Sequence, residues 1–207
     1  MSEHDQPPAG LAADPDADLR ELVLDNPGQG SFEEYKHLRD TIRARAPGNL
    51  LVFGVGKDSR FWVEANQGGK TVFIEHEAEW IEKTREMIPG VVVYQVTYRT
   101  RRPQWKQLLH RQDKLFMEDL PNDVLATNWD VIFVDSPQGG SPKRPGRMQS
   151  IYTAWVLAKR STDVHVLVHD CDRDVEQLYS DTYLGPERMV TQVRTLRHYL
   201  FRPTGTR

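Results

Sequence analysis

Residues 50–59 read LLVFGVGKDS, and this stretch decides the fold class. Its first four residues are apolar on both alternations, a pattern typical of a parallel strand that is covered on both faces. Gly54 and Gly56 follow the strand, and Asp58 and Ser59 open a helical pattern. Glycines at a strand end allow a sharp turn and let a ligand lie against the main chain, although tight turns that bind nothing use them too. The stretch predicts a buried strand, a glycine turn and a helix.

Short apolar runs alternate with helical patterns along the rest of the chain. The predicted strands are residues 49–55, 71–74, 91–94, 131–134 and 164–168, and the helices between them are residues 59–66, 77–87, 103–111 and 147–159. Alternation of this kind gives right-handed βαβ units. A last run at residues 195–201 alternates apolar and polar residues and predicts an antiparallel edge strand. The expected fold class is α/β, a Rossmann-like, mostly parallel, doubly wound sheet.

The length of the chain limits the number of domains. A chain of 207 residues is long enough for one well-buried core and short for two ordinary domains. Residues 1–19 are rich in Ala, Asp and Pro and have little to bury, so we expect a disordered tail there and a single domain over residues 20–207. Ser31 and Glu34 have the spacing of a capping box and predict a first helix over residues 31–46.

Charge and cysteine count limit the partners and the compartment. The formal net charge is -3, which predicts neither nucleic acid nor a membrane surface as a partner. Cys171 is the one cysteine, so an intramolecular disulfide or a multi-cysteine zinc site is excluded, and we expect it to have a packing role. The sequence has no signal-peptide pattern and no run near the roughly 18 apolar residues of a membrane span. We expect a cytoplasmic protein.

Glu75 and the glycine turn indicate a cofactor. Glu75 ends the second predicted strand about 20 residues beyond the glycines, where folds of this class place a carboxylate that accepts both hydroxyls of a ribose. A dinucleotide-binding turn has a third glycine, whereas Arg60 takes that place here and Asp58 lies beside the turn. An acid at the turn disfavours a pyrophosphate and suits S-adenosylmethionine, which carries an ammonium and a sulfonium group.

Polar residues also follow the fourth and fifth predicted strands. Asp135 and Ser136 follow one of them, and His169 and Asp170 follow the other. Ligands of open α/β sheets bind at these strand ends, so we expect the side chains to meet there. Two mechanisms stay open: one of Asp135, His169 and Asp170 removes a proton from an acceptor hydroxyl, or the two aspartates hold a divalent cation.

The loop over residues 136–148 carries Lys143, Arg144 and Arg147 among glycines and prolines. Cations at the mouth of a site recognise a carboxylate or a phosphate, so we expect these three residues to bind the substrate. The alternative is an exposed charged loop with no ligand.

The chain resembles the DUF579 family, whose characterised plant members include glucuronoxylan 4-O-methyltransferases and IRREGULAR XYLEM15-type proteins. The likeness covers roughly residues 49–176 and rests on the ordered segments NLLVFGVGKDS, TVFIEHEAEWI, VYQVTYRT, WDVIFVDSPQG, PGRMQSIYTAWVLA and LVHDCDRDVE. It implies a class I methyltransferase fold, S-adenosylmethionine as methyl donor and an oxygen acceptor. By motif, it places Gly54, Gly56, Asp58 and Ser59 at the methionine end of the donor, Glu75 at the ribose, and Asp135 and Ser136 at the methyl-transfer centre.

The leading hypothesis is therefore an S-adenosylmethionine-dependent O-methyltransferase, with a methyltransferase-like domain over residues 20–207. The sequence lacks the apolar anchor that directs the plant enzymes to the Golgi, so we expect a soluble acceptor, a small molecule or a saccharide, with a hydroxyl or carboxylate group. The alternatives are a non-catalytic scaffold protein of the same fold and an enzyme that uses the cofactor for another reaction, such as intramolecular displacement at its methionine chain. The acceptor, a metal and the oligomeric state are left open.

Overall fold

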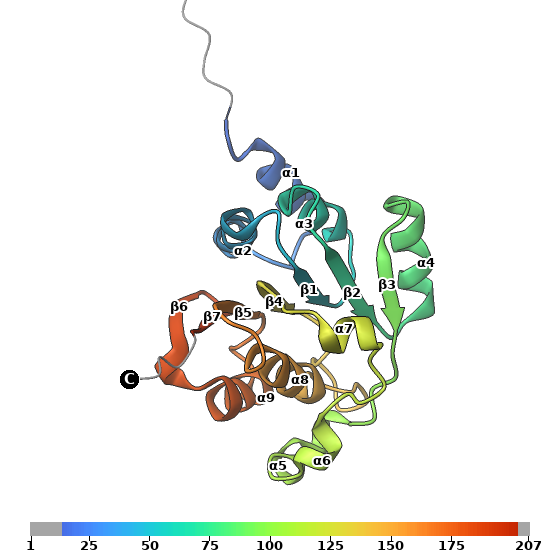
Figure 1. The fold of residues 1–207 in the computed structure, drawn as a ribbon, viewed down its shortest axis with the longest axis vertical. Helices are drawn as coiled ribbons and strands as arrows, with labels where there is room; N and C mark the ends of the chain where they lie inside the picture. Colours follow the sequence, from blue (N-terminus) through green and yellow to red (C-terminus); the bar gives the residue numbers. More distant parts are fainter. Residues whose placement is uncertain (1–13, 203–207) are drawn as a thin grey trace, which may run out of the picture.

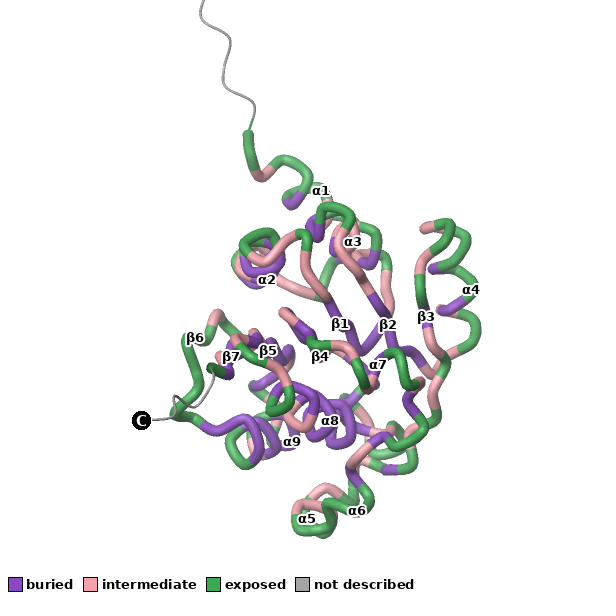
Figure 2. Tube along the Cα trace, in the orientation of Figure 1, coloured by how far each residue is buried: buried purple, intermediate pink, exposed green. Residues whose placement is uncertain are grey.

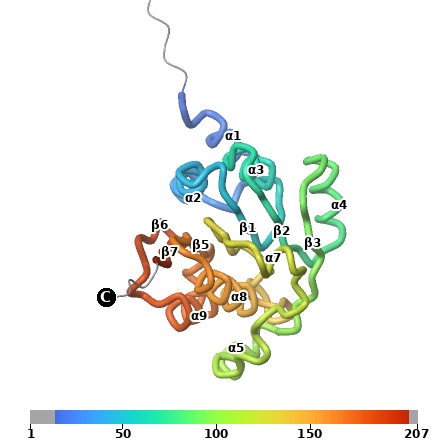
Figure 3. Tube along the Cα trace, viewed as in Figure 1, coloured from blue at the N-terminus to red at the C-terminus, as the bar shows by residue number. Residues whose placement is uncertain are grey.

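A computed structural model describes residues 14–202, and its centre is a seven-stranded sheet. The strands are β1 (Leu50–Phe53), β2 (Thr71–Glu75), β3 (Val92–Gln95), β4 (Val131–Val134), β5 (Val164–Val168), β6 (Met189–Val193) and β7 (Leu196–Phe201). They lie in the order β3-β2-β1-β4-β5-β7-β6, with β1 to β5 parallel and β7 antiparallel to β5. This is the expected doubly wound fold with an antiparallel edge. Figure 3 shows that the C-terminal hairpin β6–β7 and strand β3 lie at opposite edges.

Alternate residues of the central strands enter two separate cores. Leu51 and Phe53 belong to one apolar cluster, and Leu50 and Val52 belong to the other. Successive side chains of a strand point to opposite faces, so a strand that is apolar at every position needs helices on both sides. The burial colours in Figure 2 follow this rule, because the central strands are purple along their length.

Helices cover both faces of the sheet (Figure 1). The helices are α1 (Ala17–Asp25), α2 (Phe32–Arg45), α3 (Ser59–Ala65), α4 (Ala78–Met87), α5 (Trp105–Leu108), α6 (Gln112–Leu115), α7 (Asn122–Ala126), α8 (Met148–Ala158) and α9 (Asp174–Tyr179). Helices α1 to α4 contribute to the cluster that contains Val52, and α6 to α9 contribute to the cluster that contains Phe53. Within residues 14–202, no helix is long and apolar enough to cross a membrane.

Several elements differ from the sequence-based expectation, and helices α6, α7 and α9 were not predicted. Helix α1 begins at Ala17 and Leu19 is fully buried, so the predicted tail extends too far; residues 1–13 lie outside the described residues. Strand β6 was not predicted, because its side chains are exposed or half-buried and its pairing with β7 holds it in the sheet. The predicted helix over residues 103–111 is a 3₁₀ turn at Arg102–Gln104 followed by the single turn α5.

Candidate active site

A pocket of about 430 Å³ opens at the carboxyl ends of β1, β2 and β4, next to the point where the strand order reverses between β1 and β4. Ligands of open α/β sheets bind at such a switch point, and this volume lies in the range of small-molecule sites. The residues predicted for the cofactor all line this pocket: Gly54, Gly56, Asp58, Ser59, Glu75, Asp135 and Ser136.

Side chains in place of the two glycines of the turn would clash with neighbouring atoms. Gly54 has a φ of +113°, and a Cβ there would lie 2.7 Å from Cβ of Ser136. A Cβ at Gly56 would lie 2.8 Å from a carboxylate oxygen of Asp58. The Gly56 amide donates to the hydroxyl of Ser59 over 2.9 Å, which ties the turn to the start of α3. The turn is therefore fixed in place and leaves its main chain open to the pocket.

Two carboxylates lie at separate places in the pocket. Asp58 is half-buried at the start of α3, and burial followed by the charge of Asp135 raises its pKa to about 6. A cationic ligand group beside Asp58 would offset both effects. Glu75 is buried at the end of β2, and its carboxylate accepts backbone hydrogen bonds from His76 and Glu77, at 2.5 and 2.8 Å, and from Val55 at 3.3 Å. Burial acts to raise the pKa of Glu75, but contacts with His76 and these amides hold it below its usual value.

The acids and the glycine turn fit S-adenosylmethionine. Asp58 lies at the glycine turn, where the ammonium of the methionine moiety would bind, and Glu75 lies one strand away, where the ribose hydroxyls would bind. A pyrophosphate would meet the negative charge of Asp58 at the same turn, so the donor set disfavours a dinucleotide.

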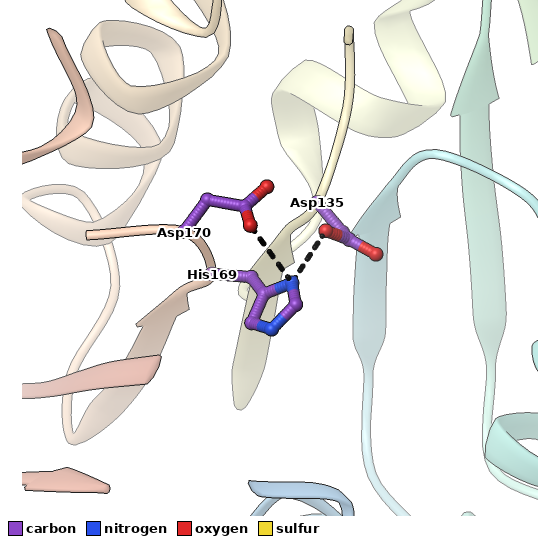
Figure 4. A group of neighbouring side chains, drawn as sticks. All are labelled: Asp135, His169 and Asp170. Carbon is purple, nitrogen blue, oxygen red and sulfur yellow. Dashed lines mark hydrogen bonds and ion pairs between the residues drawn. The ribbon is translucent and has the colours of Figure 1, made fainter. Parts of the chain in front are cut away.

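Asp135 and His169 form a hydrogen-bonded pair beside the pocket. Figure 4 shows His169 Nδ1 facing one oxygen of Asp135, and the N···O distance is 3.0 Å. The other Asp135 oxygen, Oδ2, makes no hydrogen bond with any residue in the described part of the chain. His169 Nε2 lies 3.7 Å from the carboxylate of Glu34 on α2. Burial acts to lower the pKa of His169, but Asp135 and then Glu34 raise it to about 10, so the ring is an imidazolium at neutral pH.

Arg147 differs most from its expected role. We predicted that it binds substrate, but its guanidinium is buried just before α8 and does not line the pocket. It lies 3.0 Å from Asp135 Oδ1 and 2.6 Å from Asp170 Oδ2, and it donates to the His169 carbonyl over 2.7 Å. Asp170 also pairs with Arg173 at 2.7 Å and does not line the pocket. Arg147 and Asp170 therefore hold the two strand ends together, and neither reaches the cavity.

The divalent-cation hypothesis does not fit this arrangement. One ligand atom from each of Asp135, His169 and Asp170 lies within 4.8 Å of the others. The guanidinium of Arg147 lies between the two aspartates and contacts a carboxylate oxygen of each. A cation would have to displace Arg147, so no chemical step is assigned to a metal.

The remaining two cations of the predicted substrate loop lie on the surface. Lys143 is exposed, and Arg144 pairs at 3.1 Å with Glu77, a residue that lines the pocket. The backbone of Arg144 also accepts a 2.9 Å hydrogen bond from the Arg102 amide, which brings a second basic segment to this rim. Arg144 is therefore the member of the predicted group that lies next to the pocket.

Several residues of the site were missed by sequence reasoning. The end of α1 and the segment after it close one side of the pocket with Asp25, Asn26, Pro27 and Gln29. Tyr35, Trp62 and Trp80 add aromatic walls. The composition of the first segment did not indicate a pocket, because it is typical of a polar loop. Glu34 was identified as a helix cap, and it is one: its carboxylate accepts from the Ser31 amide at 2.9 Å. Its contact with His169 depends on the tertiary fold.

Comparisons with known proteins give consistent relatives. A sequence model described as IRX15/IRX15L/GXM matches residues 33–199. Protein IRREGULAR XYLEM 15 from Arabidopsis thaliana is 39% identical, with 82% of this chain and 60% of that protein covered. Arabinogalactan O-methyltransferase 2 and Glucuronoxylan 4-O-methyltransferase 2 of the same plant are 34% and 36% identical; 83% of this chain is covered in each case, and 66% and 65% of those proteins. The chain thus spans less than two thirds of the length of these curated relatives.

One solved structure supports the fold. A methyltransferase-like protein from Silicibacter pomeroyi superposes with a TM-score of 0.50 at 15% identity, and the match covers 81% of this chain and 84% of that one. At this identity the likeness concerns the Rossmann-like fold alone.

Proposed function

The chain belongs to the IRX15/IRX15L/GXM family, and from this premise and the pocket we propose that it is an S-adenosylmethionine-dependent O-methyltransferase whose acceptor is a saccharide hydroxyl. The observation that carries the proposal is the state of Asp135. One of its oxygens is held by His169 and Arg147, while the side chain lines the pocket with 34% of its surface exposed. A carboxylate fixed on one side and open on the other is suited to orient an acceptor hydroxyl.

One set of residues binds the cofactor, and Asp135 binds the acceptor. When bound, S-adenosylmethionine supplies an electrophilic methyl group. Asp58 and the glycine turn bind its methionine end, and Glu75 binds the ribose. Asp135 Oδ2 accepts a hydrogen bond from the acceptor hydroxyl and takes its proton as the oxygen is methylated. Although burial acts to raise it, Arg147 and His169 hold the Asp135 pKa below its usual value. Asp135 is still basic enough, because a hydroxyl oxygen becomes strongly acidic once it gains a methyl group.

A saccharide acceptor is supported by two independent points. Two of the relatives carry names that state methylation of glucuronoxylan and of arabinogalactan. Arg144 lies at the rim of the pocket. Lys143 precedes it in the chain, and the Arg102 amide donates a hydrogen bond to its carbonyl. Guanidinium and ammonium groups at a rim favour a sugar that carries a carboxylate.

Calorimetric titration with S-adenosylhomocysteine, followed by methyl transfer from labelled S-adenosylmethionine to neutral and acidic oligosaccharides, tests the proposal. We expect cofactor binding by the wild type and by Asp135→Asn, and transfer by the wild type only, with the acidic acceptor preferred. Well-folded protein that binds no S-adenosylhomocysteine at high micromolar concentration would contradict the cofactor assignment. Bound cofactor without transfer to any saccharide would contradict the acceptor assignment.

A further inference from the structure

Glu34 joins three elements that the sequence keeps far apart. It lies at the start of α2 and is 5% exposed. One carboxylate oxygen accepts from the amide and the hydroxyl of Thr195, at 2.9 and 2.6 Å, in the turn between β6 and β7. The same oxygen lies 3.7 Å from Nε2 of His169 at the end of β5. A helix cap alone does not need these contacts, because the Ser31 amide is satisfied by the other oxygen.

His169 is placed between two acids. Glu34 faces one ring nitrogen and Asp135 faces the other at 3.0 Å, so both nitrogens point at carboxylate oxygens. A neutral imidazole has one N–H, and it would leave one of these acids facing a lone pair. An imidazolium donates a hydrogen bond to Asp135 from Nδ1 and pairs its charge with Glu34 at Nε2, which is the state that this geometry favours.

Acidic groups outnumber cationic groups around His169. The acids that face it are Glu34 from α2, Asp135 after β4, and Asp170 after β5, which has an oxygen 3.9 Å from Nδ1. The cations of the network are Arg147 before α8 and Arg173 before α9. Asp58 at the start of α3 adds a longer-range negative charge. Asp135 and Asp170 contact Arg147, and Asp170 also contacts Arg173, whereas Glu34 contacts neither guanidinium. The buried Glu176 is a further carboxylate near these two arginines. A protonated His169 adds a positive charge where carboxylates outnumber guanidinium groups.

We propose, on the basis of the proposed function, that Glu34 is a positioning residue: its buried carboxylate holds His169 as an imidazolium, and the imidazolium fixes Asp135 for the acceptor hydroxyl. His169 is then no proton acceptor in the reaction, since it already carries both protons. This assigns the roles that the sequence left open. Asp135 meets the substrate, His169 orients Asp135, and Glu34 maintains the charge of His169.

The test uses Glu34→Gln with Ser31→Ala as its matched control. Glutamine at the third position of a helix preserves the capping box, so Glu34→Gln removes the charge and keeps the cap. Its amide nitrogen then replaces the oxygen that accepts from Thr195, so the variant also loses those two hydrogen bonds. Ser31→Ala removes the cap hydroxyl that accepts from the Glu34 amide and keeps the charge. The first readout is the ring protonation of His169, followed by NMR in histidine-labelled full-length protein between pH 5.5 and 10 and assigned with His169→Gln.

We expect a wild-type imidazolium through pH 8 and a His169 pKa at least about one unit lower in Glu34→Gln, with Ser31→Ala unchanged. The kcat of Glu34→Gln for methyl transfer should begin to fall with rising pH at a lower pH than the wild-type kcat does, by the same shift as its His169 pKa, with an unchanged KM for S-adenosylmethionine. A neutral His169 in the wild type at pH 7.5 would overturn the proposal. A Ser31→Ala protein that reproduces the Glu34→Gln titration would also overturn it. The NMR readout needs no turnover, so these results are separate from a failure of the methyltransferase assignment.

Discussion

His37 Nε2 on α2 lies 3.0 Å from His198 Nδ1 on β7, and His198 Nε2 in turn lies 2.8 Å from His165 Nδ1 on β5. The three rings form a hydrogen-bonded row that fastens the helix to the sheet, away from the pocket. Burial, and then the charges that its two neighbours would carry, lower the pKa of His198 to about 3. Burial also lowers the pKa values of His37 and His165.

This row predicts acid sensitivity. A histidine with a depressed folded-state pKa stabilises the fold when neutral, and that stability is lost as pH falls below the unfolded value of 6.5 toward about 3. Each such group contributes a slope of up to about 1.4 kcal/mol per pH unit. Urea unfolding between pH 7.5 and 4.5 should show a steep loss in the wild type and a shallower loss in His198→Gln. Equal slopes in the two proteins would refute this role of the row.

Gly54→Ala should destabilise the protein and abolish cofactor binding. The positive φ at Gly54 strains any other residue, and the new Cβ would lie 2.7 Å from Ser136 Cβ. Gly68→Ala is the matched control, because Gly68 also has a positive φ but nothing within 4 Å of the added carbon. Thermal unfolding should show about 1–3 kcal/mol lost from backbone strain at both positions and a further loss at Gly54 only. Equal losses in the two variants would count against the close approach of the two loops.

Glu75→Ala should weaken S-adenosylhomocysteine binding. Loss of charge-assisted hydrogen bonds to the ribose costs on the order of 1.5–3 kcal/mol for each bond. The exposed Glu79 on α4, which pairs with Lys83, provides the control variant Glu79→Ala. Calorimetry of the three proteins at one pH measures the difference, and unchanged affinity in Glu75→Ala would remove this residue from the cofactor site.

Cofactor affinity should rise with pH through the titration of Asp58. With a pKa of about 6, Asp58 is largely neutral at pH 5 and ionised at pH 7, and the ionised form attracts the ligand ammonium. Binding of S-adenosylhomocysteine should therefore tighten between pH 5 and 7 by about tenfold. In Asp58→Asn this increase should be absent and affinity at pH 7 should be lower. A wild-type affinity that stays constant over this range would argue against Asp58 as the partner of the ammonium.

The strands of the sheet were predictable where burial requires a run of apolar residues. Strands β4 and β5 begin and end at the predicted residues because each is apolar on both faces. Strand β6 has exposed side chains, so only its hydrogen bonds with β7 define it. Helix α1 was missed for a related reason: Leu19 is its one buried residue, and charged residues are interspersed among its apolar ones.

The residues of the candidate site were predictable at the strand ends, but the contacts between distant parts of the chain were not. The glycine turn and Glu75 follow local rules of α/β folds, so their spacing identifies them. The Glu34 contact with Thr195 spans 161 residues, and no local pattern encodes it. Arg147 was misassigned because a cation in a glycine- and proline-rich loop reads as exposed, whereas the aspartates after β4 and β5 provide it with a buried place.

Arg147 also constrains which positions of this fold can vary. Its guanidinium bonds to groups in both loops that follow β4 and β5, so a change at either aspartate leaves a buried guanidinium with one carboxylate partner instead of two. Under the proposed function, a new acceptor specificity is therefore reached more readily through the exposed positions around Lys143 and Arg144, which can vary without breaking this bridge. Libraries that randomise the rim and leave Arg147 and its aspartates intact should retain folded, cofactor-binding members.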